Sequence, residues 1–158
     1  MKKILLLLLL STTIAAPAFA RLGETQAELK KRYGTPLPQV RKEALVWLFE
    51  ADEDGGQLLL SVTFDAKGVS IAEGLKPLKH AKLTRDSVEG FIDLQLEPYR
   101  KSPTVRTVKP GTKYRFAGKD LTCAEHELVI VDDPNSLLIV WNQSAVPSVM
   151  AVTPVMMR

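Results

Sequence analysis

The chain has 158 residues, of which 46% are hydrophobic and 25% are charged, and its formal net charge is +3 at pH 7. This length fits one domain or two very small ones, and the near balance of 21 basic and 18 acidic residues gives little support to a nucleic-acid partner. A single cysteine, Cys123, excludes an internal disulfide, so the fold has to rest on its hydrophobic core.

The first twenty residues have the three zones of a secretory signal peptide. Lys2 and Lys3 make a positive start, residues 4–10 are apolar, and the letters AFA at 18–20 form a small-x-small cleavage site. The apolar run is too short to cross a bilayer, which takes about 20 apolar residues. We therefore expect cleavage after Ala20 and a soluble exported protein, periplasmic or secreted. Cleavage leaves 138 of the 158 residues and lowers the formal charge from +3 to +1, because both lysines leave with the leader.

The mature chain is predicted to open with a short capped helix. Thr25 and Glu28 have the spacing of a capping box, in which each side chain accepts a backbone N–H at the helix start. Gly34 can take the left-handed conformation that ends a helix, and Pro36 prevents its continuation. The pattern predicts a helix over residues 25–33. A helix this short is marginal alone and has to dock on other elements.

Three strands are predicted to follow this helix. Residues 44–50 (ALVWLFE) form the first, and residues 58–65 (LLLSVTFD) alternate with the period of a half-buried strand. The acidic turn ADEDGGQ separates them, and the turn DAKG precedes a third strand over 69–73. Residues 22–74 therefore form a first unit of one helix and an antiparallel meander.

A second unit of the same order is predicted over about 84–142. Asp86 and Glu89 repeat the capping-box spacing, and Pro98 ends the helix near Glu97. Strands are predicted over 113–116, 121–124, 128–132 and 137–142. The repeated order of helix and strands suggests an internal structural repeat. The predicted fold class is α+β: one domain over 21–142, made of two helix-plus-antiparallel-sheet units whose helices pack on one face of the sheet.

Residues 143–158 are apolar but contain two prolines, Pro147 and Pro154. Proline lacks a backbone N–H and is poorly tolerated in central strands and in helix interiors. We expect an extended apolar tail that lies on the domain. The alternative is a free segment that adds a strand to the sheet edge of another protein.

Several motifs within residues 22–74 together resemble a known family. They are Gly23-x-Thr25-x-x-Glu28-Leu29, Tyr33-Gly34-x-Pro36, Trp47-x-Phe49 and Val62-x-Phe64-x-x-x-Gly68-Val69. This set is similar to the small outer-membrane-assembly lipoproteins of the SmpA/OmlA (BamE) type and to the related β-lactamase-inhibitor-protein fold, in which helix–sheet units occur in tandem. The resemblance implies a binding or scaffold module without catalysis. Arg21 stands where those lipoproteins carry a lipidated cysteine, so no lipid anchor is expected.

Cys123 and His126, in the letters CAEH, are the best candidates for chemistry. A thiolate and an imidazole can bind a soft metal or act as nucleophile and base. In an extended segment, however, residues three apart point to opposite faces, and no second CxxC or HxxxH motif supplies further metal ligands. We expect Cys123 to be a buried hydrophobe and His126 a turn residue. The letters ADEDGG depart from the calcium-binding loop pattern and are expected to form a solvated loop.

Binding to another molecule is the remaining class of function. The stretch from Arg100 to Lys119 carries seven cations and no acidic residue, which suits an anionic lipid, a cell-wall polymer or an acidic protein face, or else a solvated connection. Trp47 and Phe49 are expected in the core, although an exposed aromatic face on a sheet would anchor an interface. The candidate binding residues are Trp47, Phe49, Arg106, Lys109, Lys113 and Arg115.

The leading prediction is a non-enzymatic protein-binding or scaffold module of the bacterial envelope. Its partner is predicted to be another exported or envelope protein, with membrane contact that is at most peripheral. No catalytic residue, metal or cofactor is predicted, and the oligomeric state stays open. Two alternatives remain: a metal-dependent or thiol enzyme centred on Cys123 and His126, and a small-molecule carrier with an apolar pocket between helices and sheet.

Overall fold

The computed structural model describes residues 21–38, 43–51, 56–78, 81–134 and 136–157. Over these ranges the chain forms helices and antiparallel strands, so the predicted α+β class is confirmed. The predicted signal peptide and residues 52–55 of the predicted acidic turn lie outside the described residues. None of the helices in the described part is long and apolar enough to cross a membrane.

Helix α1 spans Gln26–Tyr33 and begins as its sequence predicts. The Oγ1 of Thr25 accepts the backbone N–H of Glu28 at 3.3 Å, and the Oε2 of Glu28 accepts the backbone N–H of Thr25 at 2.8 Å. At the other end the N–H of Gly34 donates to the Lys30 carbonyl at 2.9 Å. Both the capping box and the glycine stop are therefore confirmed. Leu29 is fully buried and attaches the helix to the core.

Helix α2 spans Arg85–Leu96, and its predicted cap is wrong. The N-cap is Thr84, whose hydroxyl accepts the backbone N–H of Ser87 at 3.2 Å. Thr84 has the extended backbone that a cap requires, whereas Asp86 already lies inside the helix. Glu89 instead forms an ion pair with Arg85, with 2.6 Å between Oε1 and Nε. The 3₁₀ helix η1 (Glu97–Tyr99), which contains Pro98, follows directly.

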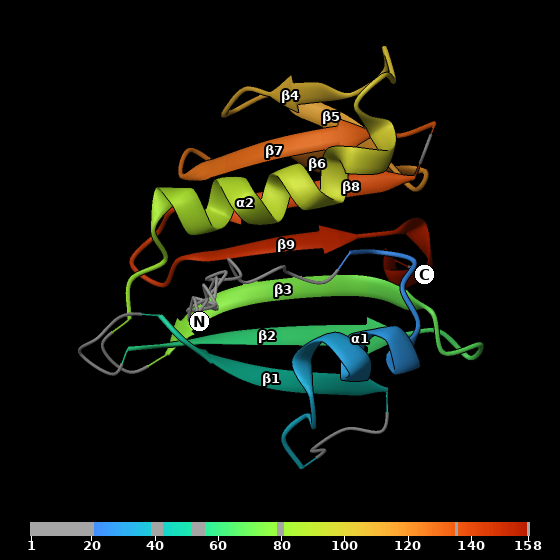
Figure 1. Ribbon diagram of the computed structural model, residues 1–158. Helices are drawn as coiled ribbons and strands as arrows, with labels where there is room; N and C mark the ends of the chain where they lie inside the picture. The colour runs from blue at the N-terminus through green and yellow to red at the C-terminus, as the bar shows by residue number, and fades with distance from the viewer. Residues whose placement is uncertain (1–20, 39–42, 52–55, 79–80, 135, 158) are drawn as a thin grey trace, which may run out of the picture.

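One antiparallel sheet runs through both predicted units (Figure 1). Its strand order among the described residues is β1-β2-β3-β9-β8-β7-β4. A separate hairpin consists of β5 (Lys113–Phe116) and β6 (Lys119–Thr122). The sheet strands are β1 (Ala44–Glu50), β2 (Gln57–Phe64), β3 (Ser70–Leu78), β4 (Arg106–Val108), β7 (Glu127–Asp132), β8 (Leu137–Asn142) and β9 (Ser148–Val152). Two of them, β4 and β9, have no counterpart in the sequence prediction, and β3 is longer than predicted.

Strand β9 lies in the middle of the sheet, so residues 148–152 of the predicted tail are extended as expected but belong inside the domain and not on its surface. Ala151 pairs with Glu73 of β3 on one side and with Ile139 of β8 on the other. Pro147 directly precedes the strand, and Pro154 begins the 3₁₀ helix η2 (Pro154–Met157) after it. The two prolines therefore bound the strand without removing an N–H from its ladder.

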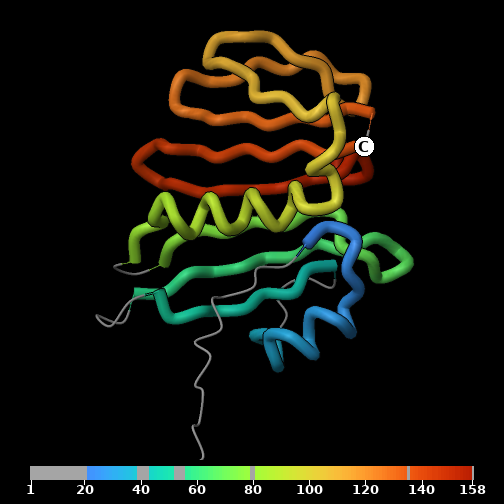
Figure 2. Tube along the Cα trace, turned by 45° about the horizontal axis from the view of Figure 1, so that its top comes forward, coloured from blue at the N-terminus to red at the C-terminus, as the bar shows by residue number. Residues whose placement is uncertain are grey.

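The buried side chains form two clusters on opposite faces of the sheet. The first contains Leu29 of α1 and Phe91 of α2, and the second contains Phe116 of the hairpin. Side chains alternate between faces along a strand, and accordingly Ile139 belongs to the first cluster and its neighbour Leu138 to the second. We call these the helix face and the hairpin face. Both helices lie in front of the sheet in Figure 1, and Figure 2 shows the same arrangement turned by 45°.

Candidate functional site: an open groove on the sheet

The hairpin covers only part of the hairpin face. The strand register places Val46, Ser61, Gly74, Met150 and Val140 in one row across β1, β2, β3, β9 and β8, and the row continues to Val129 of β7. Val129 is fully buried in the second cluster, Val140 is half-buried, and Met150 is 43% exposed. The cover therefore ends within β3 and β9: Ala72 and Val152 are still buried in the second cluster, whereas Ser61, Gly74 and Met150 are not buried. We call the uncovered part around these three residues the open sheet face.

An open groove of about 300 Å³ lies on this face. Gly74 forms part of its floor, with its cross-strand partners Ser61 on one side and Met150 on the other. The hydroxyl of Ser61 donates to the Gly74 carbonyl at 3.4 Å, which turns that small side chain towards the strand. Two small residues side by side in adjacent strands therefore create the hollow. Its other lining residues include Lys76, Glu127, Val140, Asn142 and Ser148.

Gly74 is not required by its own backbone. Its φ lies outside the left-handed region, and a Cβ placed there would come within 3.3 Å of the Ser61 Oγ and 3.9 Å of the Val149 carbonyl oxygen. The nearer atom belongs to a side chain that can rotate. Glycine inside a strand costs roughly 0.5–1 kcal/mol relative to alanine, and it often marks a place where another molecule approaches closely. Gly74 therefore indicates a contact site.

Exposed apolar side chains lie around the groove, and polar side chains lie at its border. Leu48 is 37% exposed and lies opposite Leu59, in the next row of the same face. Val146, in the loop between β8 and β9, is 75% exposed. Lys76 is exposed, whereas Asn142 and Ser148 are half-buried. An apolar centre with a polar rim is the usual composition of a protein interface.

Three of the four predicted cations lie together in a second hollow. Arg106 of β4 lines it with Lys113 and Arg115 of β5, and its volume is about 570 Å³. Asp120 is the acidic residue in its lining, and its Oδ1 lies 3.7 Å from the Nε of Arg115. Lys109 lies apart, in a hollow that it shares with His126. We call the first of these two hollows the basic hollow; its excess of cations suits an anionic group.

Trp47 belongs to the core as expected, so its alternative role as an exposed anchor is wrong, and Phe49 packs against the core. Trp47 is 2% exposed, and its Nε1–H donates to the carbonyl of Gly34 at 3.2 Å. Phe49 is half-buried, and its ring lies edge-on to that of Tyr33 with 5.3 Å between centroids. Both side chains lie on the helix face, where they hold α1 against β1. Aromatic type alone does not reveal which side of a strand faces solvent.

The expectation that Cys123 is buried and that His126 is a turn residue is confirmed. Cys123 is fully buried, and its Sγ lies 3.6 Å from the Glu127 carbonyl oxygen and 3.8 Å from that of Val108. Burial raises the pKa of its thiol, and nearby glutamates raise it further. His126 is exposed in the turn before β7. The described part of the chain contains no group of three or more His, Cys, Asp and Glu residues that could hold a metal ion.

Sequence reasoning missed Gly74, Ser61 and Met150 as site residues. The third strand was predicted to end before Gly74, so this glycine lay at a predicted strand end. The available signal was an isolated glycine followed by further apolar residues, which is typical of a strand that continues past a close contact. Met150 lies on β9, which was predicted as part of a tail.

The chain matches no protein-family model, no curated protein and no solved structure.

Proposed function

We propose that the protein is an exported, non-enzymatic binding or scaffold module that holds another exported or envelope protein on its open sheet face. The observation that carries this proposal is the groove over Gly74, because neither backbone conformation nor a backbone contact requires a glycine there. The resemblance of residues 22–74 to the BamE-type lipoproteins points to the same class of module. It also suggests two helix–sheet units whose helices pack on one face.

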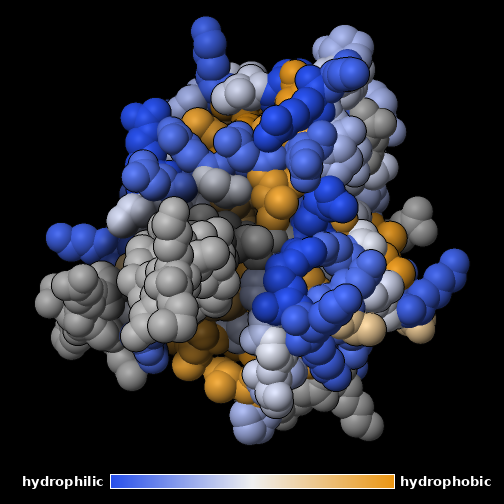
Figure 3. Space-filling view, viewed as in Figure 1, coloured by the Kyte–Doolittle hydropathy of each residue, from blue (hydrophilic) through white to orange (hydrophobic). Residues whose placement is uncertain are grey.

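The way in which the helices and the hairpin cover the sheet supports the open sheet face as the binding site. The helices occupy the helix face, and in Figure 3 hydrophilic residues predominate over α1 on that side of the molecule. The hairpin occupies part of the hairpin face. Apolar side chains such as Leu48 and Met150 remain in contact with water on the rest of it. Removing apolar surface from water is the main favourable contribution to protein association.

The side chains of the groove and of the basic hollow indicate which kind of partner would bind. A partner side chain that enters the groove should be apolar, because Val140 and Met150 flank its floor. The basic hollow suits acidic residues on the same partner, since complementary charge raises the association rate and selects among partners. We therefore infer a partner with an apolar anchor beside an acidic surface.

The burial of Cys123 supports a binding module over a thiol enzyme, because a reactive cysteine has to be accessible and to ionise readily. The open form of the groove supports a protein partner over a small-molecule cargo, since small-molecule sites enclose most of their ligand.

Capture from an envelope extract tests the proposal. The immobilised protein is compared with Gly74→Leu, which fills the groove, and with Met150→Lys, which places a charge beside it. Val155→Lys is the matched control, because Val155 is 50% exposed but lies in η2 outside the groove. We expect the wild type and Val155→Lys to retain a partner that both groove variants lose by about tenfold or more. Equal capture by all folded forms contradicts the proposal.

A further inference from the structure

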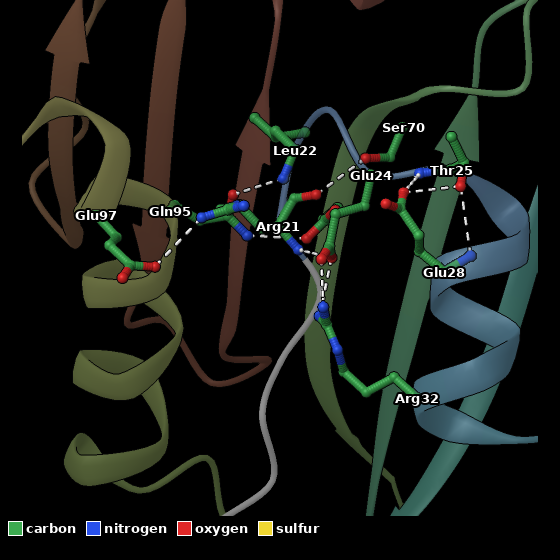
Figure 4. Close-up of polar contacts among 10 residues, drawn as sticks. Arg21, Leu22, Glu24, Thr25, Glu28, Arg32, Ser70, Gln95 and Glu97 are labelled. Atoms are coloured by element: carbon green, nitrogen blue, oxygen red, sulfur yellow. Dashed lines mark hydrogen bonds and ion pairs between the residues drawn. The ribbon is translucent and has the colours of Figure 1, made fainter.

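A cluster of buried polar side chains lies on the helix face, where the segment before α1 meets β3 and α2. Glu24 is 9% exposed, and Ser70, Glu73 and Gln95 are each 1% exposed. Figure 4 shows Glu24, Ser70 and Gln95 turned towards the backbone of Arg21 and Leu22 from three different elements. Buried polar groups are normally fully hydrogen-bonded. Each side chain in this cluster can therefore be checked for its partners.

The backbone at Arg21 is held by side chains on several sides. Its N–H donates to the Oε2 of Glu24 at 2.9 Å, and its carbonyl accepts the hydroxyl of Ser70 at 3.1 Å. The next N–H, that of Leu22, donates to the Oε1 of Gln95 at 3.0 Å. Residues at the end of a chain are usually poorly ordered unless contacts hold them in place. Here three side chains from different elements fix the backbone at residues 21 and 22.

Glu73 is the incomplete member of the cluster. Its Oε2 accepts the Nε2–H of Gln95 at 2.8 Å, but its buried Oε1 has no hydrogen-bond partner among the described residues. Burial raises the pKa of this carboxyl group to about 8; the charge of Glu24 also raises it, while Gln95, Ser70 and Arg32 lower it. A buried carboxylate oxygen without a partner is costly. The Oε1 of Glu73 can therefore accept one more hydrogen bond.

Two contacts place Glu73 beside the backbone of Arg21 and Leu22. Gln95 donates to Glu73 and accepts from the N–H of Leu22, so one side chain separates the carboxylate from that backbone. The hydroxyl of Ser70, which donates to the carbonyl of Arg21, also lowers the pKa of Glu73. Glu24, which accepts the N–H of Arg21, acts electrostatically on Glu73 as well.

We propose that this cluster is the binding site for the α-ammonium group of Arg21, which forms when the chain is cut after Ala20. The inference rests on the export that is part of the proposed function. Hydrolysis of the Ala20–Arg21 peptide bond consumes one water, leaves a carboxylate on Ala20 and turns the peptide N–H of Arg21 into an NH₃⁺ group. The reaction thus adds a positive charge and two further N–H donors at an atom that already contacts Glu24.

Charge balance favours this site. Without the ammonium, the cluster contains two carboxyl groups, those of Glu24 and Glu73, and one guanidinium, that of Arg32, which is paired with Glu24. Burial raises the pKa of Tyr33 on α1 to about 12, and the charge of Glu73 also raises it. The guanidinium of Arg21 lies outside the cluster, 3.3 Å from the Oε2 of Glu97 in η1. An ammonium group would bring the buried charges to two of each sign, and buried charges are stable only when paired.

The experiment compares three forms of the chain at their N-terminus: Arg21 with a free amino group, Arg21 acetylated, and Arg21 still preceded by Ala20. Denaturant unfolding is measured from pH 5 to pH 11, and NMR measures the pKa of the α-amino group. We expect that pKa to lie at least about one unit above its ordinary value of about 7.7–8.0, which corresponds to a tenfold change in equilibrium. The unfolding equilibrium constant at pH 7 should accordingly be about tenfold smaller for the free amine. This advantage should disappear as the pH rises through the raised pKa. Equal stability of all three forms, or an ordinary pKa, overturns the proposal.

Two variants separate the site from its surroundings. Glu73→Gln should reduce the difference between the free and the acetylated chain; the NMR measurement, which needs no variant, decides if this variant does not fold. Glu97→Gln is the control, because Glu97 contacts the guanidinium of Arg21 and should leave the difference unchanged. N-terminal sequencing of the exported protein tests the processing separately. A mature chain that does not begin at Arg21 contradicts cleavage after Ala20, whereas equal stabilities reject the ammonium site even where that cleavage occurs.

Discussion

The Nε2 of Gln95 lies 2.8 Å from the Oε2 of Glu73, and this hydrogen bond joins α2 to the middle of the sheet. Both side chains are 1% exposed. The core on the helix face therefore contains an ionisable group that accepts a hydrogen bond from α2 and whose pKa responds to Ser70 and Glu24. Stability should respond to the protonation of that one carboxyl group.

The first prediction concerns pH, for the chain with a blocked amino terminus. Burial raises the pKa of Glu73 from its ordinary value of 4.5 to about 8, so the folded state binds this proton more tightly than the unfolded state. Its contribution to stability is fully present below about pH 4.5 and is lost as the pH rises through about 8. We expect the free energy of unfolding to fall by a few kcal/mol across this window, at about 1.4 kcal/mol per pKa unit.

Denaturant unfolding at pH 5, 7 and 9 measures this fall. Glu73→Gln should remove it, whereas Glu89→Gln, a substitution at an exposed position on α2, should preserve it. A wild-type profile that rises with pH, or one that Glu73→Gln does not alter, is incompatible with the buried acid described here.

The second prediction concerns the thiol of Cys123. Because this side chain is fully buried and its pKa is raised, a thiol reagent at neutral pH should label it more than about a hundredfold more slowly in the folded protein than in denaturant. Ala145→Cys places a second thiol at an exposed loop position and should react at once. Rapid labelling of Cys123 itself would restore the thiol-enzyme alternative.

The third prediction separates the two faces of β1. Trp47→Ala removes a core side chain and should lower the free energy of unfolding by about 3–5 kcal/mol. Leu48→Ala changes the next residue, which is 37% exposed on the opposite face, and should cost less than about 1 kcal/mol. Chemical denaturation of both variants gives the comparison. Similar losses for the two would show that the faces of β1 are assigned incorrectly.

The fourth prediction concerns the basic hollow. The double variant Lys113→Glu with Arg115→Glu should slow association with the captured partner by about tenfold at low salt, and less at high salt where charges are screened. Lys109→Glu is the single-site control, because this exposed lysine lies in another hollow. Association rates at two ionic strengths provide the measurement. A comparable effect of Lys109→Glu would indicate that net charge matters and the hollow does not.

Sequence patterns over a few residues were sufficient to predict the features that are stabilised by contacts within a few residues. The capping box of α1 joins residues three apart, and the glycine stop acts within one turn, so both could be predicted from neighbouring letters. The bounds of β1 and β8 likewise follow from short runs of apolar residues. The N-cap of α2 was misplaced, because two candidate hydroxyl or carboxylate groups stood close together and only the backbone conformation distinguishes them.

Strand β9 could not be predicted from its own residues. Its place in the sheet depends on pairing with β3, about 80 residues earlier, and its flanking prolines favoured a tail. Strand β4 has three residues and is defined only by its pairing with β7. In both cases the hydrogen bonds that define the strand join segments that lie too far apart in the sequence for a short local pattern to include both.

The amino-acid sequence alone was enough to establish the α+β class, the capped first helix and the location of most strands, because these depend on side-chain periodicity and on contacts within a few residues. The tertiary structure decided the site. Gly74 forms a groove only because Ser61 and Met150 lie beside it on other strands, and Arg106 joins Lys113 and Arg115 only because β4 lies next to the hairpin. A surface is made by residues that are adjacent in space, and pairing across the sheet determines which residues those are.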